Sequence, residues 1–394
     1  MNPALLSPEI QQFIHEHLHD DLAKLLLKYK EVEGIPFAEI IEQIEAKIRC
    51  YKKLPTWFSC KNIYFPNKLN IEQTSSEQTA TYKASLIKGS SMIDLTGGFG
   101  VDCYAFSKQF QKVTHCEIAE KLSSIVAHNY KVLGIKNITT VNEDGISFLQ
   151  NNQQTYDWIY IDPSRRNDLK GKVFLLEDCL PDVVTHKETL FKFADNILIK
   201  TSPLLDITNG LRALENVKEV HVVAVNNEVK ELLWVLDKNL KTENICVKTV
   251  NLKKQEIETF DFYLSEEKEQ TIDFSLPKKY LYEPNAAILK AGGFLSIASK
   301  YKIEKLQQHS HLYTSNELIS FPGRRFSIEK VLPYTKKIIK KELNLKKANV
   351  TTRNFPESVA TIRKKLTLAD GGTDFLFLTT VFTGKKAVIH CKKA

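Results

Sequence analysis

The chain of 394 residues lacks any apolar run of the roughly 18 residues that a membrane span needs. Its seven cysteines are scattered and include no C-x-x-C pair, which excludes a zinc-finger framework and is typical of a reducing compartment. Residues 1–20 are acidic, unlike a signal peptide. His15, His17 and His19 have no Cys or acid to complete a metal site, so we interpret them as exposed polar residues. We expect a cytoplasmic protein with no membrane partner and no metal.

The net charge of the chain is +8, and its distribution is uneven. Residues 331–366 carry eight lysines and two arginines against two glutamates, so this region alone accounts for the whole excess. A basic region on an otherwise neutral chain points to a polyanion, nucleic acid first. The alternative is a lysine-rich helix face that is only solvated.

The N-terminal residues 1–74 predict a helical region followed by a linker. Ser7-Pro8-Glu9 is an N-cap with a proline and an acid in the first turn. Isoleucines and leucines recur at helical spacing up to about residue 55, with a break at Gly34-Ile35-Pro36. The aromatic-rich stretch 54–70 is expected to pack the linker, and Ser75-x-x-Gln78 predicts the start of the next helix.

From residue 91 to residue 236 the pattern alternates between strands and helices, which predicts a parallel sheet covered on both faces. For residues 228–236 we favour a strand over a helix, and two further β-prone runs extend that edge of the sheet. The expected strands are 91–95, 112–116, 138–141, 158–161, 196–200, 219–225, 228–236, 246–252 and 260–264.

Asp94 lies at the end of the first expected strand, and the turn Thr96-Gly97-Gly98-Phe99-Gly100 and a helix follow it. Glycines in such a strand–turn–helix context let the backbone approach a nucleotide-like ligand closely. The spacing D-x-T-G-G-x-G is not the dinucleotide fingerprint and lacks the P-loop lysine. Pyrophosphate and ATP phosphates are therefore poor candidates for the ligand, and a plain tight turn is the alternative.

Acidic residues follow the next strands of the predicted sheet: Glu117, Asp144 and Asp162. Ligands of open parallel sheets bind at the carboxyl ends of the strands. If the ligand is an adenosine derivative, Glu117 can accept from both ribose hydroxyls and Asp144 from the adenine amino group. Asp94 and the glycine loop can face an amino-acid-like moiety. Each acid taken singly could also be a surface residue or a helix cap.

This pattern resembles the class I S-adenosylmethionine-dependent methyltransferases over residues 75–236. The resemblance implies an α/β, Rossmann-like sheet of seven strands with an antiparallel last strand, and S-adenosyl-L-methionine as the cofactor. It implies the following cofactor-binding residues: Asp94, Thr96, Gly97, Gly98, Gly100, Glu117, Asp144, Gly145 and Asp162.

The stretch Asp162-Pro163-Ser164-Arg165-Arg166 occupies the position of the D/N-P-P-Y/F/W motif of amino-methylating members. In that motif a carboxylate and a backbone carbonyl accept from the target amine, so the expected catalytic residues are Asp162, Pro163, Ser164 and Arg165. Ser164 replaces the second proline and Arg165 the aromatic residue that stacks on a base. The arginines could stack on a base or pair with a phosphate, or they could only pair with Asp168 or Glu177.

Beyond about residue 280 the chain predicts a small α+β module with basic helices at 328–343 and 356–366 and strands at 375–382 and 386–391. The whole chain is similar to bacterial methyltransferases with a C-terminal THUMP-like domain. The stretches that carry this resemblance are D-L-T-G-G-F-G-V-D, D-P-S-R-R, E-P-N-A-A-I-L-K-A-G, L-Y-T-S, F-P-G-R-R-F and T-R-N-F-P-E-S-V. That resemblance implies a methyltransferase core at 75–279, a ferredoxin-like segment at 280–325 and a THUMP-like RNA-binding domain at 326–394. The expected nucleic-acid-binding residues are Arg165, Arg166, Arg324, Arg325, Arg353, Arg363 and Lys364.

The resulting hypothesis is that the protein is a methyltransferase that acts on tRNA or rRNA at an exocyclic nitrogen of a base. Guanine N2 is the first candidate for that nitrogen and adenine N6 the second. One alternative is an RNA-binding protein whose methyltransferase-like fold is a non-catalytic scaffold. Another keeps the enzyme and changes the substrate to DNA or protein.

Overall fold

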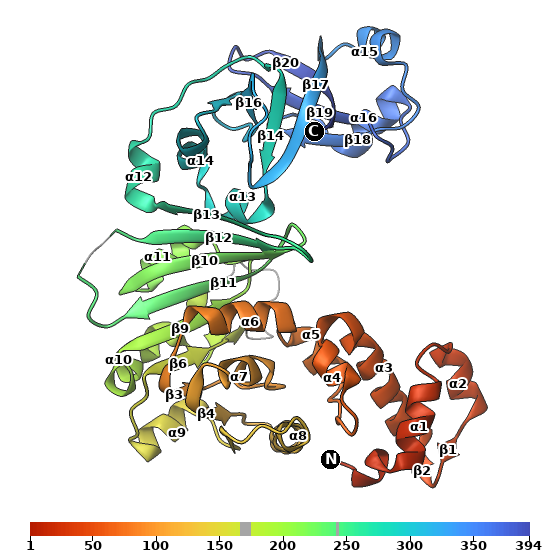
Figure 1. Ribbon diagram of the computed structural model, residues 1–394, viewed down its shortest axis with the longest axis vertical. Helices are drawn as coiled ribbons and strands as arrows, with labels where there is room; N and C mark the ends of the chain where they lie inside the picture. The colour runs from red at the N-terminus through yellow and green to blue at the C-terminus, as the bar shows by residue number, and fades with distance from the viewer. Residues whose placement is uncertain (166–174, 242–243) are drawn as a thin grey trace. The chain divides into compact units, whose positions relative to one another are not determined.

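A computed structural model describes residues 1–165, 175–241 and 244–394 (Figure 1). None of the helices in these ranges is both long and apolar enough to cross a membrane. The described residues form two compact units. The first comprises Met1–Val217 with Leu233–Lys241, and the second comprises Lys218–Leu232 with Thr242–Ala394.

The N-terminal part of the first unit consists of short helices, as predicted. They are η1 (Pro3–Leu6), α1 (Pro8–Glu16), α2 (Leu22–Lys28), α3 (Phe37–Lys53), α4 (Pro55–Ser59) and α5 (Lys68–Gln73), with strands β1 (Glu31–Val32) and β2 (Ile35–Pro36) between α2 and α3. Ser7 caps α1, because its Oγ accepts the Ile10 N–H at 3.3 Å. The predicted break at Gly34 is the turn between β1 and β2, where Gly34 has φ +73°. Helix α3 then buries Ile40 and Ile44.

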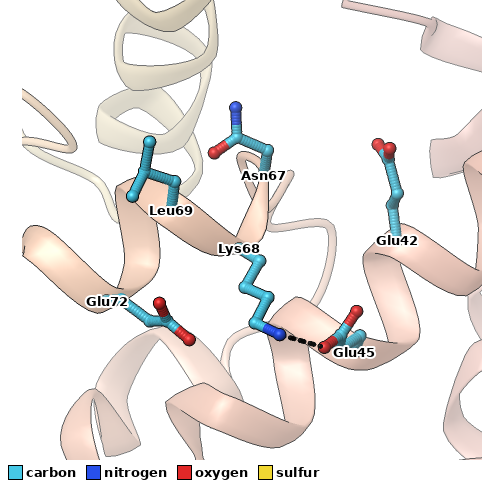
Figure 2. Close-up of a pocket in the computed structure, with 6 residues that line it drawn as sticks. All are labelled: Glu42, Glu45, Asn67, Lys68, Leu69 and Glu72. Carbon is cyan, nitrogen blue, oxygen red and sulfur yellow. Dashed lines mark ion pairs between the residues drawn. The ribbon is translucent and has the colours of Figure 1, made fainter.

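A hollow of about 430 Å³ lies beside helices α3 and α5 (Figure 2). Its charged residues are mostly acidic, and Lys68 pairs with Glu45 at 3.5 Å. The lining residues are Glu42, Glu45, Asn67, Lys68, Leu69 and Glu72. This hollow is built from the N-terminal helices alone and includes none of the predicted site residues.

The large sheet has nine strands in the order β13-β12-β10-β11-β9-β6-β3-β4-β5. Its strands are β3 (Gly89–Asp94), β4 (Phe110–Cys116), β5 (Ile138–Val141), β6 (Trp158–Ile161), β9 (Asn196–Thr201), β10 (Val217–Val225), β11 (Glu228–Asp237), β12 (Cys246–Leu252) and β13 (Ile257–Tyr263). Neighbouring strands from β5 to β9 pair in parallel. Ile93, Ile159 and Leu198 are fully buried in them, as expected for parallel strands covered on both faces.

The predicted strand at 228–236 is confirmed as β11. Only Asn226 and Asn227 separate it from β10, and both have positive φ, as in a two-residue hairpin turn. Neighbouring strands joined by so short a turn are antiparallel. The seven strands that the family resemblance implied are therefore extended by β12, parallel to β10, and by β13, antiparallel to β12.

Helices connect these strands in the first unit. They are α6 (Glu77–Leu86), α7 (Val101–Phe106), α8 (Glu120–Val132), α9 (Gly145–Asn152), α10 (Val183–Phe193) and α11 (Ile207–Ala213), with a 3-10 turn η3 (Leu176–Asp178) and the small strands β7 (Ser164–Arg165) and β8 (Cys179–Leu180). The cap of helix α6 is Ser76, one residue later than the predicted Ser75. Ser76 accepts the Thr79 N–H at 3.1 Å, and the Ser75 hydroxyl donates to Asp102 at 2.8 Å instead.

The second unit contains a separate seven-stranded sheet in the order β15-β16-β14-β17-β20-β19-β18. The elements of this region are α12 (Leu264–Glu269), β14 (Tyr280–Pro284), α13 (Ala286–Ala291), α14 (Phe294–Tyr301), β15 (Glu304–Lys305), β16 (Tyr313–Ser315), β17 (Gly323–Pro333), α15 (Lys336–Leu343), β18 (Asn349–Arg353), α16 (Val359–Leu366), β19 (Phe375–Thr380) and β20 (Lys386–Lys393). Strand β19 is apolar on both faces. Phe375 and Phe377 belong to one core cluster, and Leu376 and Leu378 to another.

The predicted basic helix at 328–343 is wrong in its first half. Residues 323–333 form β17, which pairs with β14 and β20, and only Lys336–Leu343 is helical. The pairing places Val331 opposite Ile389 and Leu332 opposite Val388. Cross-strand partners distant in the chain thus outweigh the local helical pattern. Strand β17 also crosses the domain boundary expected at residue 325, so residues on both sides of that boundary belong to one sheet.

Candidate active site

The loop after β3 is built around the buried carboxylate of Asp94. One of its oxygens accepts the Thr96 N–H at 2.9 Å and the Thr96 hydroxyl at 3.2 Å. The Cys103 thiol donates to the other oxygen at 3.3 Å. Burial raises the pKa of Asp94 to about 7, and the nearby charges of Asp102 and Asp162 act in the same direction. The carboxylate that was predicted to face the ligand is therefore buried, and its hydrogen bonds stabilise the glycine loop.

Two glycines of the predicted set show why this site needs them. Gly98 has φ +54°, and a Cβ there would meet only one atom within 4 Å, so it lies in open space in a conformation that side chains disfavour. Gly145 begins helix α9, and a Cβ there would lie 2.5 Å from the carbonyl oxygen of Leu95. A Cβ on Gly97 would collide with the His115 side chain, and a Cβ on Gly100 would collide with the Tyr130 side chain. The start of α9 is thus packed directly on the loop after β3.

Glu117 follows β4 and lies beside the glycine loop. Its Oε2 accepts the Gly98 N–H at 3.1 Å and its Oε1 accepts the Ala119 N–H at 2.7 Å. Asp144 is exposed and caps α9, where its Oδ1 accepts the Ser147 N–H and hydroxyl, each at 2.9 Å. The predicted acids thus do stand at the ends of β4 and β5, and each also stabilises the local backbone.

Ile118 was missed by sequence reasoning. It follows Glu117, and the residue is 72% exposed, which is unusual for a large aliphatic residue. The Asn142 side chain donates to the carbonyls of Glu117 and Ile118 at 2.8 and 3.1 Å, which joins the ends of β4 and β5. An apolar residue directly after a strand-end acid was the available signal. Such a side chain can pack against the flat face of a ring.

Asp162 follows β6 and lies next to the same loop. Its N–H donates to the Thr96 hydroxyl at 2.7 Å. Pro163 is buried and Ser164 is exposed, and the Ser164–Arg165 backbone pairs with β8. Arg166 lies outside the described residues, as does Asp168, one of its possible partners. The structure therefore brings Asp94, Thr96 and Asp162 together.

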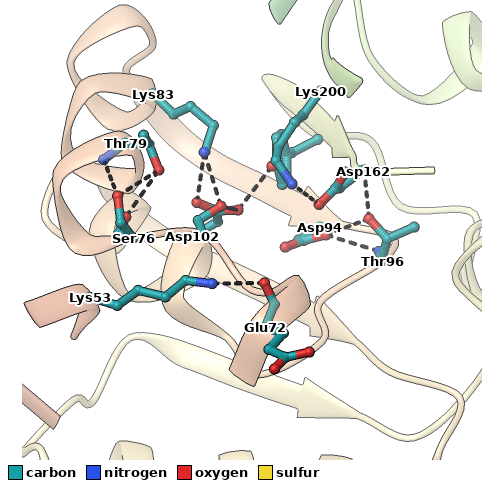
Figure 3. A network of polar contacts seen from close by, with 12 residues as sticks. Lys53, Glu72, Ser76, Thr79, Lys83, Asp94, Thr96, Asp102, Asp162 and Lys200 are labelled. Carbon is teal, nitrogen blue, oxygen red and sulfur yellow. Dashed lines mark hydrogen bonds and ion pairs between the residues drawn. The ribbon is translucent and has the colours of Figure 1, made fainter. Parts of the chain in front are cut away.

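The Asp162 carboxylate pairs with Lys200, which the sequence analysis did not single out (Figure 3). The pairing follows from strand register, because Ile161 of β6 lies opposite Ile199 of β9. The next residue of each strand therefore lies at the same edge. A basic residue at the end of the strand next to the motif was the available signal.

A second lysine lies deeper in the same network (Figure 3). Lys83 of α6 has no exposed side-chain surface, and its Nζ lies 3.3 Å from Asp102 in the first turn of α7. The Tyr160 hydroxyl donates to Asp102 at 2.9 Å. Burial raises the pKa of Asp102, but the charges of Lys83 and Lys200 together with the hydrogen bonds from Ser75 and Tyr160 outweigh that effect, so the pKa lies below its ordinary value. Asp102 is thus an ionised carboxylate held under the loop.

In the second unit two of the predicted nucleic-acid-binding arginines share one carboxylate. Glu283 is 3% exposed, and its two oxygens accept from Arg324 Nε at 2.6 Å and from Arg353 Nη2 at 2.9 Å. Arg325 donates to the Ile319 carbonyl at 3.3 Å. These side chains therefore have partners within the unit, and Arg324 and Arg353 remain 41% and 34% exposed.

The other two predicted nucleic-acid-binding residues lie on α16. Arg363 pairs with Asp370, whereas Lys364 is exposed. Ile362 and Leu366 of the same helix belong to a core cluster, so they hold the helix against the sheet. No group of three or more His, Cys, Asp and Glu side chains that could hold a metal was found among the described residues.

Comparisons with known proteins cover the whole chain. Residues 72–187 match the family described as Conserved hypothetical protein 95, residues 280–322 a ferredoxin-like domain and residues 323–393 a THUMP domain-like family. No curated protein matches the chain. The crystal structure of a "putative methyltransferase" from Porphyromonas gingivalis W83 is 32% identical, with a TM-score of 0.88 over 100% of this chain and 99% of that chain.

More distant structures match only part of the chain. An rRNA methylase from Streptococcus thermophilus is 14% identical over 41% of this chain and 93% of its own, with a TM-score of 0.30. TrmK of M. capricolum, in complex with S-adenosyl-homocysteine, is 16% identical over 41% of this chain and 68% of its own, with a TM-score of 0.31. These scores add nothing to the assignment, which depends on the end-to-end match. The chain belongs to the class I S-adenosylmethionine-dependent methyltransferases that carry a C-terminal THUMP-like domain.

Proposed function

We propose that this enzyme methylates RNA, tRNA or rRNA, at an exocyclic nitrogen of a base, guanine N2 ahead of adenine N6. The observation that carries the proposal is the 2.7 Å hydrogen bond from the Asp162 N–H to the Thr96 hydroxyl. It joins the motif expected to hold the acceptor amine to the loop expected to hold the cofactor. Donor and acceptor groups must be held within contact distance for direct transfer.

The residues around the glycine loop fit S-adenosylmethionine. Gly98 leaves open space above the loop, and Glu117 stands beside it with two carboxylate oxygens that can turn to ribose hydroxyls. The exposed Ile118 side chain can pack against adenine, and Asp144 stands at the next strand end to accept from the adenine amino group. In the part of the chain that the structure describes, Glu117 and Asp144 make hydrogen bonds only to nearby residues, and Ile118 faces solvent, so all three side chains are accessible to a ligand.

When bound, the cofactor supplies a methyl group on a cationic sulfur, which accepts the electron pair of the C–S bond as the acceptor nitrogen forms its new bond to carbon. In this proposal Asp162 and the Pro163 carbonyl accept hydrogen bonds from the acceptor amine and direct its lone pair. The nitrogen then releases one proton to water. The protein contributes mainly positioning, since the departing sulfur needs no acid.

RNA as the substrate is supported by the basic residues of the second unit. Helix α15 presents the exposed lysines Lys336, Lys337, Lys340 and Lys341, and α16 presents Lys364. Phosphates bind such side chains through charge, with an affinity that falls as salt rises. Arg165 and Arg166, next to the acceptor motif, would contact a phosphate or stack on a base.

The test is methyl transfer from labelled S-adenosylmethionine to total RNA from cells that lack this protein, with DNA and protein extracts in parallel. We expect label in one RNA class with the wild type and none with Asp162→Ala, a loss of about 10³-fold or more. Asp162→Ala should bind the cofactor with nearly unchanged affinity, as measured by calorimetry. Glu188→Ala, which removes a carboxylate that is 85% exposed on α10, is the matched control and should transfer normally.

Label in DNA or protein alone would replace RNA as the substrate. Cofactor binding with no transfer to any of the three would favour an RNA-binding protein on a non-catalytic scaffold. Full activity of Asp162→Ala would show that the motif assignment is wrong. Digestion of the labelled RNA to nucleosides then identifies the methylated atom.

A further inference from the structure

Lys200 and Thr96 hold Asp162 at two points. The Thr96 hydroxyl accepts from its backbone N–H, and the Lys200 ammonium pairs with its Oδ2. Within the described residues, Oδ1 makes no hydrogen bond. The Lys200 side chain is 13% exposed and that of Asp162 is 32% exposed, so the pair lies at the rim of the site. One carboxylate oxygen is thus fixed while the other remains able to accept.

The charges around this pair explain why a cation is needed there. Asp94, Asp102 and Asp162 come from the ends or beginnings of neighbouring elements, and the charges of Asp102 and Asp162 both act on Asp94. Lys83 and Lys200 are the cations that lower the pKa of Asp102. Without Lys200, Asp162 would lie near Asp94 with no cation bound to it. Such a carboxylate would turn away from its present position, and that change removes an acceptor for the amine.

We propose that Lys200 is a positioning residue for methyl transfer, which acts through Asp162 by holding its carboxylate oriented toward the acceptor amine. This inference rests on the proposed function of the same site. A lysine ammonium has three donors and no acceptor, so Lys200 itself cannot orient the lone pair of an amine by accepting its hydrogens. Its effect on the reaction must come from the carboxylate that it holds.

The first experiment compares Lys200→Met, which keeps the length of the side chain, with Lys200→Arg, which keeps its charge and its donors. For Lys200→Met we expect kcat to fall about 10²-fold, with the cofactor Kd and the KM for RNA within about twofold of the wild type. Lys200→Arg should recover most of the lost kcat. Lys187→Met is the matched control, because Lys187 is 12% exposed and also pairs with a carboxylate, that of Glu215. It should leave kcat unchanged.

The second experiment places Lys200→Met in an Asp162→Asn background. An asparagine carbonyl is neutral and needs no cation, and the family motif allows either residue at this position. We therefore expect Lys200→Met to change kcat by less than about twofold in this background, against about 10²-fold in the wild type. An equal loss in both backgrounds would overturn the proposal, as would wild-type activity of Lys200→Met. An Arg variant as inactive as the Met variant would also overturn it, since charge alone would then be insufficient.

A third measurement does not depend on RNA. In a crystal structure of Lys200→Met we expect the Asp162 carboxylate to leave the position that it has beside Lys200, with the glycine loop unchanged. A carboxylate in the same place would show that Lys200 does not hold it. If the wild type methylates no RNA, the proposed function fails on that assay alone, and the position of Asp162 still decides what Lys200 does.

Discussion

At the strand ends of the first unit three carboxylates share two lysines, whereas in the C-terminal sheet of the second unit one carboxylate holds two arginines. The first group is Asp94, Asp102 and Asp162 with Lys83 and Lys200. The second group is Glu283 with Arg324 and Arg353. Both combine buried with partly exposed groups, but acidic groups outnumber basic ones in the first group and basic groups outnumber acidic ones in the second.

This difference indicates what each region can bind. Once Asp94 is ionised, the first group carries surplus negative charge and favours a cationic ligand, and S-adenosylmethionine carries a positive sulfur and an ammonium group. A surface with surplus positive charge favours phosphates. The ion pairs within each group also set limits, since every paired side chain has less charge to offer a ligand. The exposed lysines of α15 and α16 are therefore better candidates for phosphate contacts than Arg324 or Arg353.

The largest effect is expected from Glu283→Gln, which removes both ion pairs of the second group. This change leaves two arginines without their shared carboxylate, and we expect the free energy of unfolding to fall by about 2–3 kcal/mol, measured by urea denaturation of the full chain. The figure is below that for fully buried pairs because both arginines are partly exposed. The control is Glu342→Gln, which breaks an exposed pair with Lys330 and should cost less than about 1 kcal/mol. Equal losses in the two variants would contradict a structural role for Glu283.

The first group can be examined through pH. Because the folded-state pKa of Asp94 is raised to about 7 from an ordinary value of 3.8, the folded protein holds a proton that the unfolded chain has already released. Stability should therefore decrease as the pH rises from about 4 to 7 and level off above that. Asp94→Asn removes this dependence, so between pH 5 and pH 8 it should gain about 2 kcal/mol relative to the wild type, measured by urea unfolding at both values. A constant difference between the two proteins would show that Asp94 does not titrate in this range.

The smallest expected effect concerns a single exposed lysine. Lys364→Glu should weaken RNA binding by about threefold to tenfold and lower the salt dependence by roughly one ion, as measured by fluorescence anisotropy over a salt series. Methyl transfer at saturating RNA should be unchanged. The control is Lys24→Glu, an exposed lysine on α2 of the first unit. If both variants weaken binding equally, the effect comes from net charge and not from a surface on α16.

Much of the site could be predicted because its pieces are local. The strands, the glycine turn and the acids after β4, β5 and β6 are short-range patterns, and the structure has them where the sequence indicates. Lys200 was missed because its role depends on the register between β6 and β9, which aligns residues 38 positions apart. The error at 328–333 has the same origin, since β17 is a strand only through its pairing with β14 and β20.

The amino-acid sequence by itself determined the order along the chain of the strands in the large sheet, the glycines of the loop and the acids at the strand ends. Those features depend on backbone preferences and on the spacing of apolar residues along a few turns or strands. Only the tertiary structure decided which charges compensate one another: Lys200 with Asp162, Lys83 with Asp102 and Glu283 with two arginines. Ion pairs form between segments far apart in the chain, and their energies depend on distance and burial that no local pattern contains.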